Sequence, residues 1–401
     1  MASGTGSLSS LRQLNRLRIV DFLRVNGTAS RAELSRRTGL SRSTVSTLVT
    51  DLQRRGIVVE QPGQFAGEGQ PGRPAALLQL DPSAGAAVGV DFDHDLVRVA
   101  VSDLSRIVLA EATVRFDVDH DAVGALDLAG DLVDQLLAEV GIGPDRVIGT
   151  GMALAGPIDH KRAALHKSTV LPGWVDIDAG VELERRVGTT VYVDNDANLG
   201  ALAEVTLGAG RNARFAAYIQ IGSGVGSGIV VDGRPYRGAR GTAGEIGHVV
   251  VDPQGPLCRC GNRGCLETVA STGALLALIN ASRGKQLTVQ EMIEEALNGD
   301  AGCRRAITDA GQVVGRVVAG LVNLFSPEMV VIGGDLGEAG ELLLEPLREA
   351  VKRDALPEAA TGLEIVAGEL GERANLLGAL ALVLMQSEHE VAARVAGGAV
   401  A

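Results

Sequence analysis

The chain has 401 residues, which is more than one hydrophobic core usually holds, so we expect two or three domains. Its composition, 46% hydrophobic and 21% charged, is that of a soluble globular protein, and it has no run of about 18 apolar residues that would span a membrane. The net charge of −12 is unevenly distributed: residues 1–82 contain 11 Arg and Lys against 6 Asp and Glu, and the remainder contains 26 against 43. This asymmetry indicates a basic nucleic-acid-binding module in front of an acidic body.

The N-terminal segment predicts a helix-turn-helix. Residues 1–13 lack the basic segment and apolar run of a secretory signal, so we expect a cytoplasmic protein. A first helix is expected over 11–25. Ser30 and Glu33 have the spacing of a capping box that opens a second helix, which ends at Gly39. Ser41 can cap a third helix that runs to about residue 55, and two short helices joined by a glycine-containing turn are the helix-turn-helix pattern.

The third helix is the expected recognition helix. Its apolar residues Val45, Leu48 and Val49 share one face and predict the side that packs in a core. The opposite side offers short hydroxyl groups and one arginine to a major groove, and the residues are Arg42, Ser43, Thr44, Ser46 and Thr47. The alternative is the ordinary polar face of a small helical bundle.

A short strand over 56–60 is followed by a segment rich in Gly, Pro and Gln over 61–74, which is either a linker or the wing of a winged helix-turn-helix. Arg73 in this segment is suited to a minor groove, where the negative potential attracts arginine. The alternative for Arg73 is a linker residue without a partner. We expect the DNA-binding domain to span 11–80.

From residue 86 onward, strand and helix patterns alternate, which predicts an α/β architecture. Strands are expected over 87–101, 147–154, 191–194, 216–231 and 329–333, with helices between them, for example over 126–140 and 303–325. We expect this body to span 86–390.

Four residues of the body form a candidate metal site. His248, Cys258, Cys260 and Cys265 offer one imidazole and three thiolates, a set suited to tetrahedral zinc, whereas Cys303 stands apart. Because four protein ligands leave no position for a catalytic water, we expect a structural zinc that pins the loop 248–265. The alternative is a group of reduced cysteines near an unrelated histidine.

The body resembles the ROK family of bacterial sugar kinases and sugar-responsive repressors, and with the helix-turn-helix almost the whole chain resembles its repressor branch. The segments that carry the resemblance are 194–198 (Asp-Asn-Asp-Ala-Asn), 244–248 (Gly-Glu-Ile-Gly-His) and 258–267 (Cys-Arg-Cys-Gly-Asn-Arg-Gly-Cys-Leu-Glu). The resemblance implies a two-lobed, actin-like fold with a sugar in the cleft between the lobes. It also implies zinc at the four residues named above, a general base at Asp196, and sugar contacts from Asn195, Glu245, His248 and Glu267.

The phosphate side of this family's site is altered here. Kinases of the family follow the first strand with Asp, an apolar residue, and Gly-Gly-Thr, but this chain has Asp-Phe-Asp-His-Asp over 91–95. Asp93 and Asp95 would place carboxylates beside a polyphosphate, although the Gly-rich segments 222–228 and 332–334 remain. We therefore expect a sugar sensor in which Asp196 is a vestigial base.

Two other functions stay open: a bifunctional regulator with residual sugar kinase activity, and a zinc-stabilised module that binds a protein and no sugar. A helix-turn-helix contacts few bases, so we expect a homodimer or a dimer of dimers on operator DNA. The sugar, and whether it releases or promotes DNA binding, also stay open.

Overall fold

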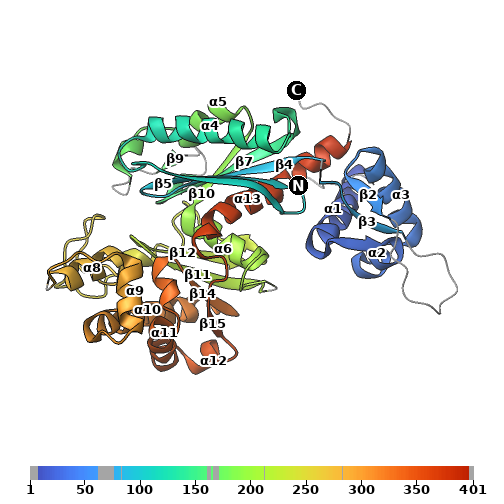
Figure 1. Ribbon diagram of the computed structural model, residues 1–401. Coiled ribbons are helices and arrows are strands. Elements are labelled where there is room, and N and C mark those ends of the chain that lie inside the picture. Colours follow the sequence, from blue (N-terminus) through green and yellow to red (C-terminus); the bar gives the residue numbers. More distant parts are fainter. Residues whose placement is uncertain are drawn as a thin grey trace, which may run out of the picture.

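The computed structural model describes residues 8–61, 76–82, 84–159, 164–165, 171–211, 213–281 and 283–396. They form a small N-terminal domain at one end of a larger body of two lobes (Figure 1). Each lobe contains a five-stranded sheet, which confirms the predicted two-lobed α/β fold class. Within these residues, no helix is long and apolar enough to cross a membrane.

The N-terminal domain consists of three helices and a small antiparallel sheet. The helices are α1 (Leu8–Asn26), α2 (Arg31–Thr38) and α3 (Arg42–Arg54), and the strands are β1 (Thr28–Ser30), β2 (Val58–Gln61) and β3 (Leu77–Leu80). Oγ of Ser30 accepts a hydrogen bond from the backbone N–H of Glu33 at 3.2 Å, and Oγ of Ser41 accepts one from Thr44 at 3.1 Å. Both predicted N-caps are thus confirmed, and α2 ends as predicted at Gly39, whose φ of 73° suits glycine.

Strands β2 and β3 pair antiparallel, with Val58 opposite Leu80 and Gln61 opposite Leu77. The Gly-rich segment therefore connects two paired strands, which is the arrangement of a wing. Residues 62–75, including Arg73, lie outside the described residues. Strand β3 was not predicted, because four residues give too short a pattern to distinguish a strand from a loop.

Helix α1 attaches the N-terminal domain to the body. Ile19, Val20 and Leu23 belong to one buried cluster with residues of the body such as Leu104 and Leu380. The neighbouring Arg24 donates a hydrogen bond from Nε to the carbonyl oxygen of Leu104 at 3.1 Å. The domain is consequently packed against the body as well as joined to it along the chain.

The first lobe contains a mixed sheet in the order β10-β7-β4-β5-β6, covered by α4 and α5. Its elements are β4 (Ala86–Phe92), β5 (Leu96–Asp103), β6 (Val108–Arg115), α4 (Ala122–Glu139), β7 (Val147–Leu154), β8 (Ile158–Asp159), β9 (Ala164–Leu165), α5 (Ala179–Val187) and β10 (Val191–Asn195). The single strand predicted over 87–101 was wrong: β4 and β5 are antiparallel neighbours. The polar residues Asp93, His94 and Asp95 lie between them, with the N–H of Asp93 bonded to the carbonyl of Leu96 at 3.0 Å.

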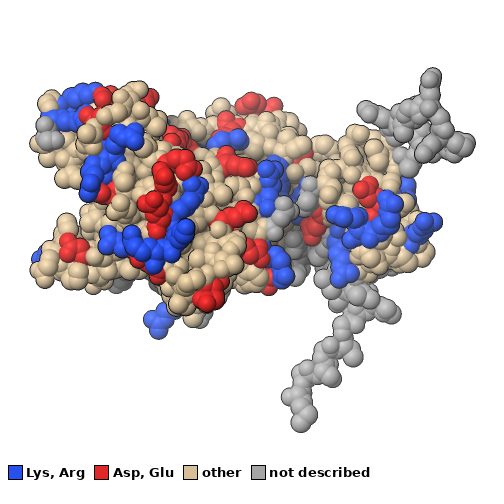
Figure 2. Space-filling view, turned by 90° about the horizontal axis from the view of Figure 1, so that it is seen from below, with Lys and Arg blue, Asp and Glu red and all other residues tan. Residues whose placement is uncertain are grey.

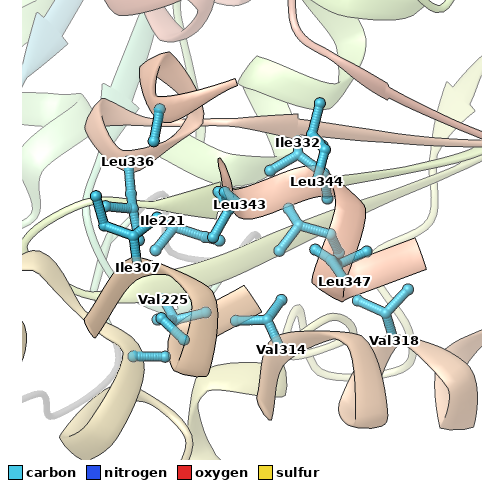
Figure 3. Packing of buried hydrophobic residues seen from close by; sticks show 14 of the residues in the cluster. Ile221, Val225, Ile307, Val314, Val318, Ile332, Leu336, Leu343, Leu344 and Leu347 are labelled. Carbon is cyan, nitrogen blue, oxygen red and sulfur yellow. The ribbon is translucent and has the colours of Figure 1, made fainter. Parts of the chain in front are cut away.

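The second lobe contains the sheet β13-β12-β11-β14-β15. Its elements are α6 (Asp196–Thr206), β11 (Phe215–Ile221), β12 (Val225–Val231), β13 (Arg234–Pro235), α7 (Glu267–Ala270), α8 (Thr272–Asn280), α9 (Val289–Leu297), α10 (Ala301–Phe325), β14 (Met329–Gly333), α11 (Glu341–Asp354), α12 (Pro357–Ala360), β15 (Glu364–Ala367) and α13 (Ala374–Ala396). Its core lies between α10, α11 and the sheet, where residues such as Val314, Leu343 and Leu347 interlock (Figure 3). The strand predicted over 216–231 also divides in two, as the antiparallel pair β11 and β12.

Helices α6 and α13 lie between the two sheets and join the lobes (Figure 1). A Cβ atom at Gly378 of α13 would collide with the backbone of Leu199 in α6, so the glycine permits the two helices to approach closely. Because α6 starts directly after β10, its N-terminal residues are placed at the cleft between the lobes.

Candidate functional site

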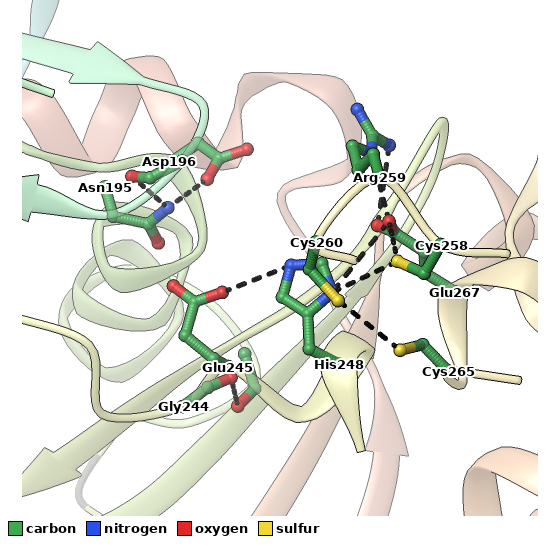
Figure 4. Close-up of polar contacts among 12 residues, drawn as sticks. Asn195, Asp196, Gly244, Glu245, His248, Cys258, Arg259, Cys260, Cys265 and Glu267 are labelled. Carbon is green, nitrogen blue, oxygen red and sulfur yellow. Dashed lines mark hydrogen bonds and ion pairs between the residues drawn. The ribbon is translucent and has the colours of Figure 1, made fainter. Parts of the chain in front are cut away.

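The N-terminus of α6 forms one wall of the cleft. Oδ1 of Asn195 accepts a hydrogen bond from the backbone N–H of Asn198 at 3.1 Å and so caps the helix. Nδ2 of Asn195 donates hydrogen bonds to the carbonyl oxygen of Gly156 at 3.1 Å and to Oδ1 of Asp196 at 2.7 Å (Figure 4). Nε2 of Gln220, on β11, donates to Oδ2 of Asp196 at 3.2 Å. The Asp196 carboxylate is thus fixed by groups from both lobes.

The environment of Asp196 raises its proton affinity. Burial raises the pKa of Asp196 to about 6, and the negative charges of Asp93 and Glu245 act in the same direction. A carboxylate with such a pKa accepts hydrogen bonds from sugar hydroxyls near neutral pH. It is also close to the range expected of a general base.

The opposite wall comes from the segment after β13. Gly244 has a φ of 94°, and a Cβ atom there would collide with the carbonyl oxygen of Ser227, so only glycine permits this approach. The next residue, Glu245, faces the cleft, where burial and then Glu267 raise its pKa. Glu267 is the first residue of α7 and is 9% exposed. Its Oε1 accepts a hydrogen bond from Nε of Arg259 at 3.0 Å.

His248, Cys258, Cys260 and Cys265 lie together beside this wall, with their potential ligand atoms all within 4.8 Å of one another. Nδ1 of His248 lies 3.6 Å from Sγ of Cys258, and the sulfurs of Cys260 and Cys265 are 3.6 Å apart, too far for a disulfide (Figure 4). In a zinc tetrahedron with bonds of about 2.3 Å to sulfur and 2.05 Å to nitrogen, the corresponding distances are about 3.8 Å between sulfurs and about 3.6 Å between sulfur and nitrogen. These two separations are close to the tetrahedral values, so the cluster is compact enough to hold a metal ion.

All five residues predicted to contact sugar line one cavity between the lobes: Asn195, Asp196, Glu245, His248 and Glu267. The Gly-rich segment from Gly222 to Ser227 lines the same cavity, as do polar residues to which the sequence analysis gave no role, among them His94, Gln220 and Arg259. Arg259 lies between Cys258 and Cys260, and a charged residue inside the cysteine segment was the sequence signal that could have indicated it. Gln220 lies in a mostly apolar strand, and no feature of the neighbouring sequence marks it as a residue of the cavity.

The predicted phosphate side of the cleft is acidic. Arg98 of β5 donates to Oδ2 of Asp91 at 3.2 Å and to Oδ2 of Asp93 at 3.3 Å. Burial raises the pKa of Asp91 to about 7 and that of Asp335 to about 6, and the charge of Asp93 contributes to both. A Cβ atom at Gly222 would lie 3.5 Å from Oδ2 of Asp335, so this carboxylate adjoins the Gly-rich loop. Asp95 lies further out and pairs with Arg115 at 2.8 Å.

The candidate DNA-reading face of α3 is solvent-exposed. Val45, Leu48 and Val49 are buried as predicted, whereas Arg42, Ser43, Ser46 and Thr47 are exposed and Thr44 is half-buried. Hydroxyl groups of Thr44 and Thr47 bond within the helix, to Oγ of Ser41 and to the carbonyl of Ser43. Figure 2 shows arginine side chains gathered on the underside of this domain.

Comparison with known proteins agrees with this geometry. Residues 87–386 match the model of the ROK family, and residues 13–64 match the MarR family. The chain belongs to the ROK family.

Among its relatives is the xylose repressor of Caldicellulosiruptor bescii, which is 32% identical over 94% of this chain and 97% of the relative. A glucokinase of Thermotoga maritima is 35% identical but covers only 58% of this chain, with 78% of the kinase matched. The crystal structure of a ROK family transcriptional regulator, a homologue of the Escherichia coli Mlc protein, matches 97% of this chain and all of its own with a TM-score of 0.80 and 26% identity. The repressor relatives thus extend over the N-terminal domain, whereas the glucokinase match covers little more than half of the chain.

Proposed function

We propose that this protein is a transcriptional repressor that binds operator DNA through its N-terminal domain and is controlled by a sugar in the cleft of its ROK domain. The observation that supports this most is the combination in one chain of a MarR-like domain, with an exposed helix α3, and a cleft lined by hydroxyl-binding side chains. Relatives of nearly equal length are named repressors. The protein acts in the cytoplasm, where the DNA is.

The DNA-reading residues are Arg42, Ser43, Thr44, Ser46 and Thr47 on α3, together with Arg73 in the connection between β2 and β3. The short hydroxyl side chains of α3 let a helix lie deep in a major groove, and Arg42 reaches base edges or phosphates. Arg73 enters the adjacent minor groove from the wing position.

The effector is a monosaccharide held by Asn195, Asp196, Glu245, His248 and Glu267. These five side chains line one cavity between the lobes, which measures about 90 Å³. Three carboxylates accept hydrogen bonds from sugar hydroxyls, and the amide of Asn195 both donates and accepts. Such a set has no purpose in a module that binds only protein.

The cluster of His248, Cys258, Cys260 and Cys265 holds a structural zinc ion. Four protein ligands would fill all positions of a tetrahedral zinc ion, so the metal would supply rigidity to the segment that presents Glu245 and Glu267. No water on the metal takes part in chemistry.

The protein has no useful kinase activity. Asp93 and Asp335 place carboxylates on the phosphate side, and Arg98 donates hydrogen bonds to Asp93 and to the neighbouring Asp91. A triphosphate brought to this place meets like charges, and such juxtaposition costs several kcal/mol. Asp196 therefore binds sugar without activating it.

The DNA-bound form is a homodimer or a dimer of dimers on an inverted-repeat operator, because one helix-turn-helix reads too few bases for specificity.

The test uses the full-length protein and a panel of neutral monosaccharides. Operator fragments are first selected from genomic DNA with the protein itself. For each sugar, the melting temperature of the protein and the amount of protein bound to these fragments are then measured. We expect one sugar or a related set to raise the melting temperature and to change DNA occupancy, with both effects reduced in Asp196→Asn. Selection that enriches no DNA sequence would contradict the repressor function, and DNA binding unaffected by every sugar would contradict the sensor function.

A further inference from the structure

A second cavity lies where the N-terminal domain meets both lobes of the body. It measures about 730 Å³ and is lined by Arg24, Ser105, Arg106, Val205, Thr206, Leu207 and Arg211. Three of its seven lining residues are arginines, and no carboxylate side chain is among them in the described part of the chain. The volume is within the range of about 300–1,000 Å³ that is typical of small-molecule sites.

The three arginines come from three different parts of the molecule. Arg24 belongs to α1, is 8% exposed, and is positioned by bonds to the carbonyl of Leu104 at 3.1 Å and to Oδ1 of Asp21 at 2.9 Å. Arg106 lies in the turn between β5 and β6. Arg211 follows α6 and donates to the carbonyl of Gly208 at 3.1 Å and to Oε2 of Glu369 at 3.2 Å.

Arg106 adopts an unfavourable backbone conformation. Its φ of 69° is in the left-handed region, which costs an arginine about 1–2 kcal/mol relative to a right-handed conformation and which Gly or Asn would adopt more readily. The turn thus presents a guanidinium at the cavity at a cost to backbone stability. Such strained residues cluster at functional positions.

The charges around the cavity favour an anion. Asp21 and Glu369 neutralise part of the positive charge, and the C-terminus of α6 contributes a further partial negative charge of about one half. Three guanidinium groups nevertheless outnumber these two carboxylates, and each guanidinium carries five N–H donors. Planar guanidinium groups bind phosphate oxygens in pairs, which makes a phosphate group the anion of choice.

We propose that this cavity binds a phosphate group, carried either by a small phosphorylated metabolite or as inorganic phosphate. The ligand contacts the DNA-binding domain through Arg24, the first lobe through Arg106 and the second lobe through Arg211. It thereby fixes the position of the N-terminal domain relative to the body.

Helix α6 connects this cavity to the sugar site. Its first residue is Asp196 in the cleft, and its last, Thr206, lines the phosphate cavity. Eleven residues at 1.5 Å each give a rod of about 16 Å, so a shift of α6 on sugar binding also changes the cavity. An effect of phosphate on DNA binding rests on the proposed function, whereas phosphate binding itself does not.

The experiment is isothermal titration calorimetry of the full-length protein, without DNA, with inorganic phosphate and with glucose 6-phosphate, against potassium chloride at matched ionic strength. The test variant is Arg106→Gln/Arg211→Gln, in which neither residue is buried. The matched control is Arg185→Gln/Arg305→Gln, two exposed arginines on α5 and α10. Arg211→Glu serves as a second variant at a side chain that is 59% exposed, so a folding defect of the first does not end the test.

We expect saturable binding of at least one of the two phosphate compounds. The first test variant should weaken it by about tenfold or more, as expected for two lost charge-assisted bonds, and Arg211→Glu should also weaken it, while the control pair leaves it unchanged. Tighter binding of glucose 6-phosphate than of phosphate identifies the ligand as an ester, and equal binding identifies free phosphate.

Three results would overturn the proposal. The first is no saturable binding above the chloride control. The second is binding that survives both cavity variants. The third is binding lost in Arg42→Gln or Asp196→Asn, which would assign the phosphate to the DNA-binding face or to the sugar cleft.

Discussion

Nδ1 of His248 lies 3.6 Å from Sγ of Cys258, while Nε2 of the same ring lies 3.9 Å from Oε2 of Glu245. The two nitrogens of one imidazole therefore face two different sites, the sulfur cluster and the cavity between the lobes. A histidine that ligates a metal through one nitrogen has its other nitrogen fixed as a donor, which suits a carboxylate or a sugar hydroxyl. Loss of the metal should accordingly release His248 and so weaken sugar binding at the proposed site.

The first prediction is that Cys260→Ala loses zinc and also weakens sugar binding. Three remaining ligands leave the metal site incomplete, so we expect the zinc content to fall from about one ion per chain to a small fraction of that. Elemental analysis of protein purified without chelator measures this, and the sugar-induced thermal shift should shrink in parallel. Cys303→Ala is the matched control, because Cys303 lies outside the cluster. Wild-type protein without zinc would contradict the metal assignment.

The second prediction concerns the DNA-reading face. Arg42→Ala should weaken operator binding by about 5- to 150-fold, the equivalent of 1–3 kcal/mol, if Arg42 contacts a base, without changing the melting temperature, because Arg42 is exposed. Arg73→Ala should also weaken it. A mobility-shift titration at fixed salt measures both, with Arg305→Ala on α10 as the control. Unchanged affinity in both test variants would place the reading surface elsewhere.

Much of this organisation was predictable because its signals are local. Caps at Ser30 and Ser41, the left-handed Gly39 and the buried face of α3 follow from short-range rules, and each is found in the structure. The cysteine spacing and the motifs around Asp196 and Glu245 likewise predicted groups that do lie together.

Features that depend on pairing between distant residues were not predictable in the same way. The pattern over 87–101 is apolar on both sides of a short polar interruption, and periodicity alone does not show that the chain reverses at Asp93. The partners of Arg98 also depend on this reversal, since the hairpin brings Arg98 opposite Asp91. The contribution of Gln220 to the cleft requires the two lobes to be placed face to face.

The third prediction is a pH-dependent stabilisation by Asp91→Asn. Burial raises the pKa of Asp91 from its ordinary 3.8 to about 7 in the folded protein, so the folded state holds this proton over a pH range in which the unfolded chain has lost it. The wild-type protein therefore loses stability as the pH rises from about 4 to 7. A neutral asparagine does not carry this penalty. The free energy of unfolding of the variant should therefore increase relative to that of the wild type over this interval, by on the order of 1–3 kcal/mol at pH 8.

Chemical denaturation at pH 5 and pH 8 measures the difference for Asp91→Asn, with Asp95→Asn as an exposed control in the same hairpin. An advantage that is larger at pH 5 than at pH 8, or a destabilisation at pH 8, would show that the Arg98 ion pair outweighs the desolvation of Asp91.

The fourth prediction is the assembly state. Light scattering should give the mass of a dimer or tetramer of this 41.4 kDa chain, and selected operator fragments should contain an inverted repeat whose half-sites are separated by whole turns of DNA. A monomer that still binds its operator tightly would contradict this.

The last prediction separates a sensor from an enzyme at Asp196. Its carboxylate is positioned by Asn195 and Gln220 and has a pKa raised to about 6 by burial, so it can hold a sugar hydroxyl. Phosphoryl transfer additionally requires a polyphosphate within reach of that hydroxyl, and the carboxylates of Asp93 and Asp335 disfavour one there. Asp196→Asn should then reduce sugar affinity and the sugar response of DNA binding while leaving DNA binding without sugar nearly unchanged.

The wild-type protein should show no sugar-dependent ATP turnover above background in a coupled assay with each sugar that binds. The decisive comparison uses the sugar that gives the largest thermal shift, at saturating ATP and magnesium, with Asp196→Asn in parallel. If the wild type turned over ATP with that sugar, and the variant did not even at sugar concentrations that saturate it, Asp196 would be acting as a base. The protein would then be a regulator that retains sugar kinase activity.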